Sequence, residues 1–157
     1  MIILDNFLTE KECNFLINYY NKHCFGECSP GSHSFLTLTL KKQWRTVPIY
    51  HFLHFRVNYL RRKIISKVFE MTKNKLQYDT ICHWPNKSFM QHHYDYTDTP
   101  YAVICYLNDD YIGGETVIGD QKIIPKRGRM ILYDGLNNLH GVNSITGNRY
   151  TYTAWFY

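Results

Sequence analysis

The sequence predicts an α+β protein with a jelly-roll core, of the cupin-like double-stranded β-helix kind, buttressed by N-terminal helices. Two observations favour this fold class. Residues before about 75 contain two segments with the apolar period of amphipathic helices. Residues from 76 onward form many short strand-like runs separated by glycine-containing turns, as all-β sandwiches and barrels do. Because 157 residues is the size of one domain, we expect a single domain over 1–157.

The first helix is expected at about residues 9–22. Thr9 is a suitable N-cap, and Glu12 follows at the spacing of a capping box, in which the two side chains bond each other's backbone N–H groups. A second helical pattern covers residues 49–73 and carries a basic run on its polar side. Such a run is more often a solvated helix face than a nucleic-acid patch, and we favour the solvated face.

The strands are expected mainly in the second half of the chain. Residues 24–34 contain turn formers without a period and predict a loop, whereas the alternation over 35–40 predicts a strand. The later apolar runs predict eight more strands, at 77–84, 88–95, 102–107, 115–118, 122–124, 129–133, 138–143 and 149–156.

Composition limits the classes of protein to which the chain can belong. A hydrophobic fraction of 45% is too high for a disordered chain. No apolar run approaches the roughly 18 residues of a membrane span, and no signal peptide is visible, so we expect a cytoplasmic protein without a membrane partner. The net charge of +5 permits an acidic partner without requiring one. Few Ala and many Lys, Asn, Ile and Tyr residues are typical of an AT-rich coding sequence, such as that of a virus or a small-genome bacterium.

The five cysteines are scattered and odd in number, so at least one is unpaired in a monomer. Without a secretion signal, reduced thiols are the expected state. A small zinc site formed by Cys24, Cys28, His23 and His33 is the weaker alternative, because the spacing is loose and the segment is loop-like.

The clearest chemical pattern is the segment MQHHYD, residues 90–95. Alternate residues of a strand share a face, so His93 and Asp95 are expected to point the same way and to offer a metal two neighbouring ligands. An H-x-D triplet alone is weak evidence. His140 is the third candidate, because a jelly-roll brings distant strands together. Two histidines and a carboxylate leave coordination positions open, which suits non-haem Fe(II), although catalytic zinc uses similar sets.

Arg149 begins a predicted strand in which alternate residues share its face. A buried guanidinium needs an anionic partner, and no acid lies near it in the sequence. A ligand carboxylate held bidentately would serve, with Tyr106 as a further donor. A surface ion pair for Arg149 and a core position for Tyr106 are the simpler interpretations when each residue is taken alone.

These residues, in this order, resemble the Fe(II)- and 2-oxoglutarate-dependent dioxygenases, and among them the prolyl 4-hydroxylase-like branch. The likeness extends over nearly the whole chain and rests on the stretches LDNFLTEKEC, HYD, CYLNDDYIGGET and HGVNSITGNRYTYTAWFY. The nine-residue spacing from His140 to Arg149 and the closing tryptophan are most similar to the hypoxia-factor prolyl hydroxylases. Collagen-type relatives generally have lysine in the place of Arg149.

The resemblance implies Fe(II) as the cofactor, with His93, Asp95 and His140 as its ligands and the catalytic residues. It also implies 2-oxoglutarate and dioxygen as cosubstrates, and ascorbate as an auxiliary reductant. Arg149 and Tyr106 would hold the far carboxylate of 2-oxoglutarate. The other implied cosubstrate residues are Thr153, Val142, Trp155 and Trp84. Thr153 and Val142 would line the pocket, and Trp155 would form one side of the site.

Trp84 departs from the family pattern, since relatives often have a tyrosine there whose hydroxyl lies near the cosubstrate. An indole can pack in that place but is a hydrogen-bond donor only. The contact to the cosubstrate therefore remains open.

The implied activity is hydroxylation of a C–H group, most simply on a prolyl residue of a peptide or protein. Related halogenases have Gly or Ala where this chain has Asp95, so the carboxylate favours hydroxylation. The loops at 23–34, 41–48, 97–100 and 108–114 would frame the entrance, and Lys41, Lys42 and Arg45 would attract an acidic peptide.

Three alternatives remain. A nucleic-acid oxygenase is less favoured, because those enzymes typically carry a second arginine where this chain has Trp155. A free amino-acid oxygenase is compatible with so small a domain. A non-catalytic metal-binding jelly-roll is opposed by the complete set of candidate ligands and Arg149.

Overall fold

Two facing antiparallel sheets form the centre of the computed structural model, which describes residues 1–24, 33–38, 54–95 and 100–157. The larger sheet has the strand order β1-β9-β5-β12-β3-β2, and the smaller has the order β4-β10-β7-β8. A further two-stranded sheet pairs β11 with β6. This arrangement confirms the predicted double-stranded β-helix, and the sheets do not close into a barrel.

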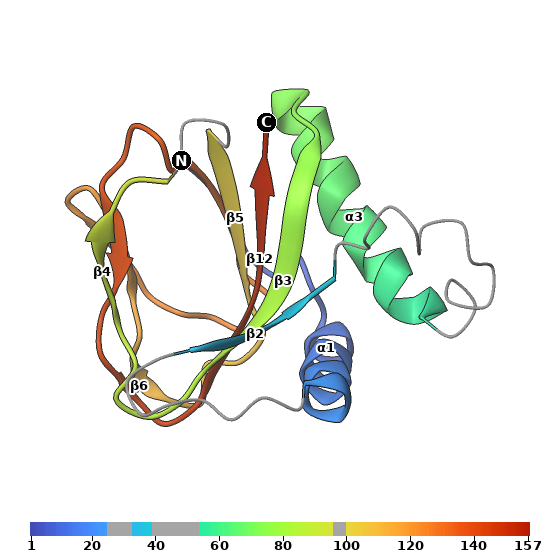
Figure 1. The fold of residues 1–157 in the computed structure, drawn as a ribbon, viewed down its shortest axis with the longest axis horizontal. Helices are drawn as coiled ribbons and strands as arrows, with labels where there is room; N and C mark the ends of the chain where they lie inside the picture. The colour runs from blue at the N-terminus through green and yellow to red at the C-terminus, as the bar shows by residue number, and fades with distance from the viewer. Residues whose placement is uncertain (25–32, 39–53, 96–99) are drawn as a thin grey trace.

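The described residues of the first half of the chain form two helices and four strands. Helices α1 and α3 lie on the side of the larger sheet that faces away from β4 (Figure 1). The elements are β1 (Ile2–Leu4), α1 (Glu10–His23), β2 (Ser34–Thr37), α3 (Phe55–Thr72), β3 (Leu76–Trp84) and β4 (Met90–His93).

The second half is made of strands alone within the described residues. They are β5 (Tyr101–Tyr106), β6 (Ile112–Gly113), β7 (Thr116–Ile118), β8 (Gln121–Ile123), β9 (Met130–Asp134), β10 (His140–Val142), β11 (Ile145–Thr146) and β12 (Arg149–Phe156).

Helix α1 begins where its capping pattern predicts. The Thr9 side chain accepts from the Glu12 N–H, and the Glu12 carboxylate accepts from the Thr9 N–H at 2.7 Å, which completes the capping box. Helix α3 accounts for the second helical pattern from Phe55 onward, and residues 49–53 lie outside the described part. No described helix is both long enough and apolar enough to cross a membrane.

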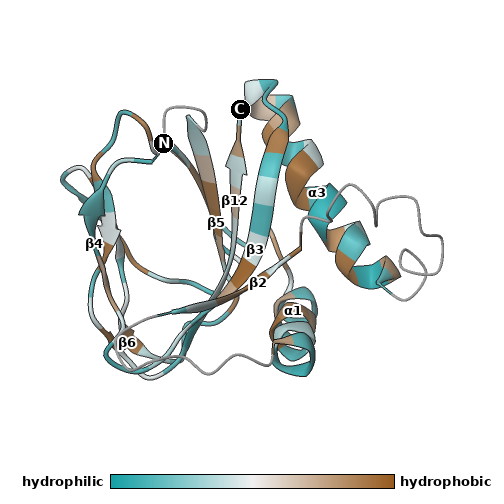
Figure 2. Cartoon of the chain, viewed as in Figure 1, coloured by the Kyte–Doolittle hydropathy of each residue, from teal (hydrophilic) through white to brown (hydrophobic). Residues whose placement is uncertain are grey.

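The helices pack on the larger sheet through their apolar faces. Polar and apolar residues alternate around both helices in Figure 2, as the predicted period requires. The buried residues of this layer include Leu16, Leu60, Ile64 and Val68 from the helices, and Val103, Tyr152, Ala154 and Phe156 from the sheet. Burial of each large apolar side chain contributes about 1.5–3 kcal/mol, so this layer supplies much of the stability.

Helix α3 is also joined to the sheet by a buried ion pair. Arg61 donates from Nε and Nη2 to the two oxygens of Asp79, at 2.5 and 2.7 Å. Asp79 is fully buried on β3 and also accepts from the Tyr152 hydroxyl at 2.8 Å. This two-point geometry fixes the helix at one register on the sheet.

Most predicted strands are present, and the differences lie at their ends. β4 ends at His93, so Asp95 lies beyond the strand rather than within the predicted run 88–95. β2 covers only Ser34–Thr37 of the predicted 35–40, and residues 39–40 are outside the described part. β1, β6 and β11 are not predicted by the sequence pattern, because strands of only two or three residues offer too short a pattern.

Candidate active site

Two histidines and an aspartate meet between the sheets. His93 ends β4, Asp95 follows two residues later, and His140 begins β10. One ligand atom from each lies within 4.8 Å of the others, and His140 Nε2 is 3.7 Å from Asp95 Oδ1. Among the described residues, this is the one group of three or more His, Cys, Asp or Glu side chains with metal-binding geometry.

A bulge in β4 decides which of its two adjacent histidines joins the site. His140 pairs with His93, whereas Val142 pairs with Met90, so β4 has one more residue than β10 between these pairs. Met90 and His93 consequently both line the cavity despite their odd spacing. A Cβ at Gly141 would lie 2.7 Å from the Met90 carbonyl oxygen, so the glycine permits this close strand approach.

Backbone contacts hold both imidazoles with one ring nitrogen facing the site. Nδ1 of His93 lies 2.9 Å from the Gln91 carbonyl oxygen, and Nδ1 of His140 lies 2.9 Å from that of Asn138. Because a carbonyl oxygen can only accept, each Nδ1 carries a proton, and Nε2 is the nitrogen that can bind a metal when the ring is neutral. Burial lowers the pKa of His140, which favours this neutral, metal-binding form.

Gly135 makes room for the Asp95 carboxylate. The Asp95 N–H donates to the Gly135 carbonyl at 2.9 Å, and Trp155 Nε1 donates to Asp95 Oδ1 at 3.3 Å. The other carboxylate oxygen, Oδ2, is buried without a hydrogen-bond partner. An unpaired buried carboxylate oxygen is costly unless a cation or a donor reaches it.

A cavity of about 90 Å³ extends from this cluster toward β12. Alternation along β12 divides its side chains, because Tyr152, Ala154 and Phe156 pack toward the helices while the residues between them face the cavity. The predicted residues that line the cavity are Arg149, Thr153, Trp155, Trp84, Val142 and the three members of the His–Asp–His cluster.

Arg149 is a buried cation without an anion. Its side chain is 1% exposed, and it forms no ion pair with any described residue. Nη2 donates to Thr116 Oγ1 at 3.3 Å, and Nε is buried without a partner. The rings of Trp84 and Tyr106 flank the guanidinium, with centroids 5.1 and 5.4 Å from Cζ. These aromatic contacts stabilise a cation only in part, so the site is suited to a ligand carboxylate.

Thr116 is a residue of this site that the sequence analysis missed. Its hydroxyl oxygen accepts from the Tyr106 hydroxyl at 2.7 Å as well as from Arg149. With both lone pairs engaged, the Thr116 hydroxyl can only donate onward. Thr116 directly follows the GGE stretch at residues 113–115, and this position could have pointed to it. Threonine is so common in strands, however, that the position alone did not mark it as a site residue.

Trp84 and its neighbour His33 close one side of the cavity. Their rings are stacked, with centroids 4.1 Å apart and an interplanar angle of 18°. Trp84 Nε1 is buried without an acceptor. His33 is therefore part of the cavity wall, which does not support the zinc alternative, and Cys28 lies outside the described residues.

Comparisons with known proteins agree with this geometry. The model of the 2OG-Fe(II) oxygenase superfamily matches residues 78–157, which include the His–Asp–His cluster and Arg149.

The chain belongs to the 2OG-Fe(II) oxygenase superfamily.

The fold of this 2OG-Fe(II) oxygenase is similar to that of several solved structures. The viral collagen prolyl hydroxylase of Paramecium Bursaria Chlorella virus-1 matches with a TM-score of 0.71 at 19% identity, over 99% of this chain and 93% of that one. A prolyl-4-hydroxylase of Pseudomonas putida matches with a TM-score of 0.67 at 16% identity, over 99% and 90% of the two chains.

A curated relative, prolyl 3-hydroxylase 2 of Homo sapiens, is 39% identical over 70 residues. The alignment covers 39% of this chain and 10% of that protein, so the oxygenase described here spans a small part of its relative's length.

The residues present fit the cofactors that the superfamily implies, Fe(II) and 2-oxoglutarate. Two imidazole nitrogens and one carboxylate oxygen, grouped on one side of a cavity, form a donor set that suits Fe(II) with positions left open. At the other end, Arg149 provides a fork of donors for a carboxylate. The Asp95 carboxylate, whose Oδ1 lies 3.7 Å from His140 Nε2, and the Arg149 guanidinium, whose buried Nε has no partner, are the charged groups that such a pair of ligands would satisfy.

Proposed function

We propose that this 2OG-Fe(II) oxygenase hydroxylates a prolyl residue of a peptide or protein, with His93, Asp95 and His140 as the iron ligands. The observation that carries the proposal is that one cavity contains two opposite charges, each without a charged partner. The Asp95 carboxylate, which forms no ion pair with a described Lys or Arg, lies at the histidine end, and the Arg149 guanidinium, which forms no ion pair with a described acid, lies at the other end. A divalent cation and a dicarboxylate satisfy both charges together.

The protein's contribution to the reaction is to bind, to orient and to exclude water. When bound, iron and 2-oxoglutarate supply the oxidising chemistry, in which decarboxylation to succinate accompanies insertion of an oxygen atom into a C–H bond. The two Nδ1–carbonyl contacts orient the imidazoles, and the Trp155 indole orients Asp95. Ile104, Tyr133 and Val142 contribute apolar surface to the cavity, which limits the access of water.

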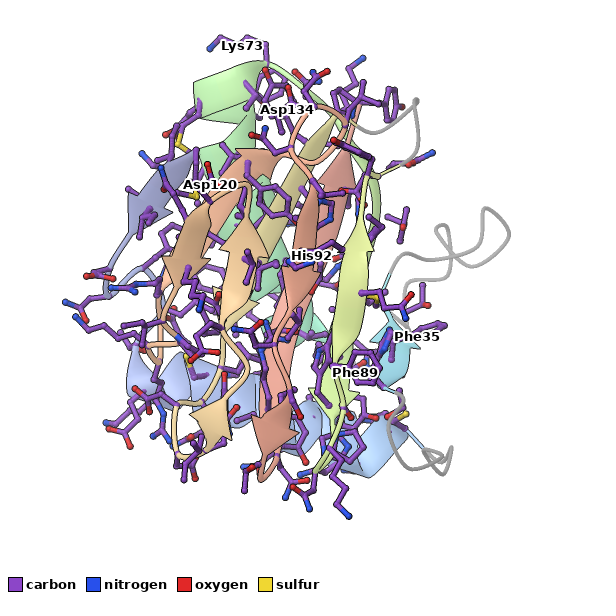
Figure 3. All side chains as sticks on the ribbon, turned by 90° about the vertical axis from the view of Figure 1, so that its left-hand side faces the viewer. Phe35, Lys73, Phe89, His92, Asp120 and Asp134 are labelled. Atoms are coloured by element: carbon purple, nitrogen blue, oxygen red, sulfur yellow. The ribbon has the colours of Figure 1, made fainter. Side chains whose placement is uncertain are left out.

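We infer that exposed aromatic rings form the rim of the cavity and suit an apolar substrate residue. Phe35 on the edge strand β2 pairs with Cys82, so its ring lies on the same face of the sheet as that cavity-lining residue. Phe35 is 59% exposed, and Phe89, just before β4, is 50% exposed. Figure 3 shows both rings on the side of the molecule where β2 and β4 form sheet edges. An aromatic rim of this kind favours the ring of a proline over a charged side chain.

The names of the three similar proteins reported above also support a prolyl substrate, since the viral, Pseudomonas putida and human proteins are each described as a prolyl hydroxylase. The basic residues Lys41, Lys42 and Arg45, which were expected to attract an acidic peptide, lie outside the described part of the structure. The same holds for most of the expected entrance loops.

The alternative substrates are less well supported. Trp155 stacks on Tyr78, with centroids 4.4 Å apart, and donates to Asp95. A neutral aromatic pair therefore lies where a nucleic-acid oxygenase would carry its second arginine. A non-catalytic binder has no need for a buried guanidinium beside the candidate metal site.

The test is succinate formation by the purified protein with Fe(II), 2-oxoglutarate and air, with and without proline-containing peptides. We expect succinate to increase with a prolyl peptide, and mass spectrometry to detect a 16-Da gain on proline. Succinate that forms at the same rate with every peptide would contradict the prolyl assignment. No succinate from a protein that binds iron would contradict oxygenase activity altogether.

A further inference from the structure

Tyr111 reaches the Arg149 end of the site, although the family resemblance assigns it no role. It lies between β5 and β6, and its ring packs against the buried cluster of Cys82, Trp84, Val142 and Ile145. A Cβ at Gly114 would lie 2.9 Å from Tyr111 Cε2 and 3.2 Å from Arg149 Cδ. Gly114, at φ +67°, therefore provides the space in which these two side chains approach each other.

The Tyr111 hydroxyl is buried and has no hydrogen-bond partner, and the same is true of Arg149 Nε. Burial raises the pKa of the Tyr111 hydroxyl and the nearby Arg149 cation offsets only part of that rise, so the phenol keeps its proton at neutral pH. A hydrogen bond from Arg149 to the phenol oxygen would not change this need, because the phenol O–H proton itself still requires an acceptor. Two neighbouring buried donors without an acceptor indicate that the acceptor is a ligand.

We propose that Tyr111 is a further cosubstrate-binding residue, whose hydroxyl donates to the same far carboxylate of 2-oxoglutarate that Arg149 binds. This inference rests on the proposed function. Its consequence is selectivity, because a donor to the far carboxylate stabilises a bound 2-oxo dicarboxylate and leaves a 2-oxo monocarboxylate unaffected. The Thr116 hydroxyl, which can only donate onward, would complete a set of donors around that carboxylate.

The test compares two ligands on three proteins. 2-Oxoglutarate and 2-oxopentanoate have the same chain length and the same keto-acid group, but only the first has a far carboxylate. Each is titrated by calorimetry into the Mn(II)-loaded full chain without oxygen, so that no turnover occurs. The proteins are the wild type, Tyr111→Phe, and Tyr59→Phe, which makes the same chemical change on the exposed face of α3.

We expect Tyr111→Phe to weaken 2-oxoglutarate binding by about 10-fold or more, as for a lost hydrogen bond to a charged group, with 2-oxopentanoate binding unchanged. Tyr59→Phe should change neither. Unchanged 2-oxoglutarate affinity in Tyr111→Phe would overturn the assignment. An equal loss of affinity for both ligands in Tyr111→Phe would also overturn the assignment, because that result indicates a packing role for the Tyr111 side chain. A wild type that binds no 2-oxoglutarate would instead contradict the proposed function, and the assignment with it.

Discussion

Gly135 leaves the space that the Asp95 carboxylate occupies: a Cβ at Gly135 would lie only 2.0 Å from Asp95 Oδ2. The backbone of Gly135 also accepts the Asp95 N–H, so this one residue sets both the main-chain and the side-chain position of the candidate ligand. Because Gly135 does not have a positive φ, its role is steric rather than conformational.

Gly135→Ala should therefore displace the Asp95 carboxylate. We expect metal affinity to fall about 10–100-fold, the usual effect of disturbing residues that support a metal ligand. Mn(II) titration followed by calorimetry measures this. Gly119→Ala is the control, since a Cβ there meets nothing within 4 Å, and any strain from its φ of +55° would lower stability without changing metal affinity.

His93→Ala should abolish 2-oxoglutarate turnover and reduce metal binding, because it removes one of the two proposed imidazole ligands. The adjacent His92 offers a matched control: it is exposed on the same strand and lies outside the His–Asp–His cluster. We expect His92→Ala to retain turnover. Near-normal succinate formation by His93→Ala, or equal loss in the two variants, would disprove the ligand assignment.

Arg149→Ala should raise the KM for 2-oxoglutarate more than it lowers kcat. Each lost hydrogen bond between charged groups is worth about 1.5–3 kcal/mol, so we expect a rise of at least about 10-fold. Arg149→Lys keeps the charge but loses the planar fork of donors. Its KM for 2-oxoglutarate should therefore lie between the values of the wild type and Arg149→Ala. Steady-state kinetics with 2-oxoglutarate as the varied substrate provides the measurement, and an unchanged KM in Arg149→Ala would rule out the carboxylate clamp.

Phe35→Ala should weaken the binding of a prolyl peptide without changing the affinity for 2-oxoglutarate. Loss of an aromatic contact at a binding surface typically costs about 1–2 kcal/mol, so the peptide KM should rise roughly 5- to 30-fold. Phe69→Ala removes a comparably exposed ring from α3 and should leave the peptide KM as in the wild type. If both variants behave alike, Phe35 is not part of the substrate rim.

Asp79→Asn should destabilise the fold while leaving the cavity residues in place. The change leaves Arg61 partly buried without its charged partner, for which we expect a loss of about 3 kcal/mol in the free energy of unfolding. Glu70→Gln breaks the exposed ion pair with Lys67 and should cost at most about 0.5 kcal/mol. Urea denaturation followed by circular dichroism compares the two, and similar losses would show that the buried pair adds no particular stability.

Local patterns were sufficient to predict most elements and the chemistry of the site. The capping box at Thr9 and Glu12 depends on residues three positions apart, and the alternation along β12 depends on neighbours two positions apart. The same alternation placed Arg149, Thr151, Thr153 and Trp155 on one face, which the cavity confirms. Residue types alone indicated which side chains could bind a metal or a carboxylate.

The remaining features depend on contacts between distant segments, which a local pattern does not encode. Alternation alone does not show that a bulge against β10 turns His93 rather than His92 toward the cavity. Nor does it show that Asp95 lies past the end of β4, in a space left by Gly135. The sequence by itself therefore determined the elements and the functional groups, because these follow from short-range periodicity and side-chain chemistry. Only the tertiary structure decided which groups meet, because it brought Thr116 and Tyr111 from one part of the chain beside Arg149 from another.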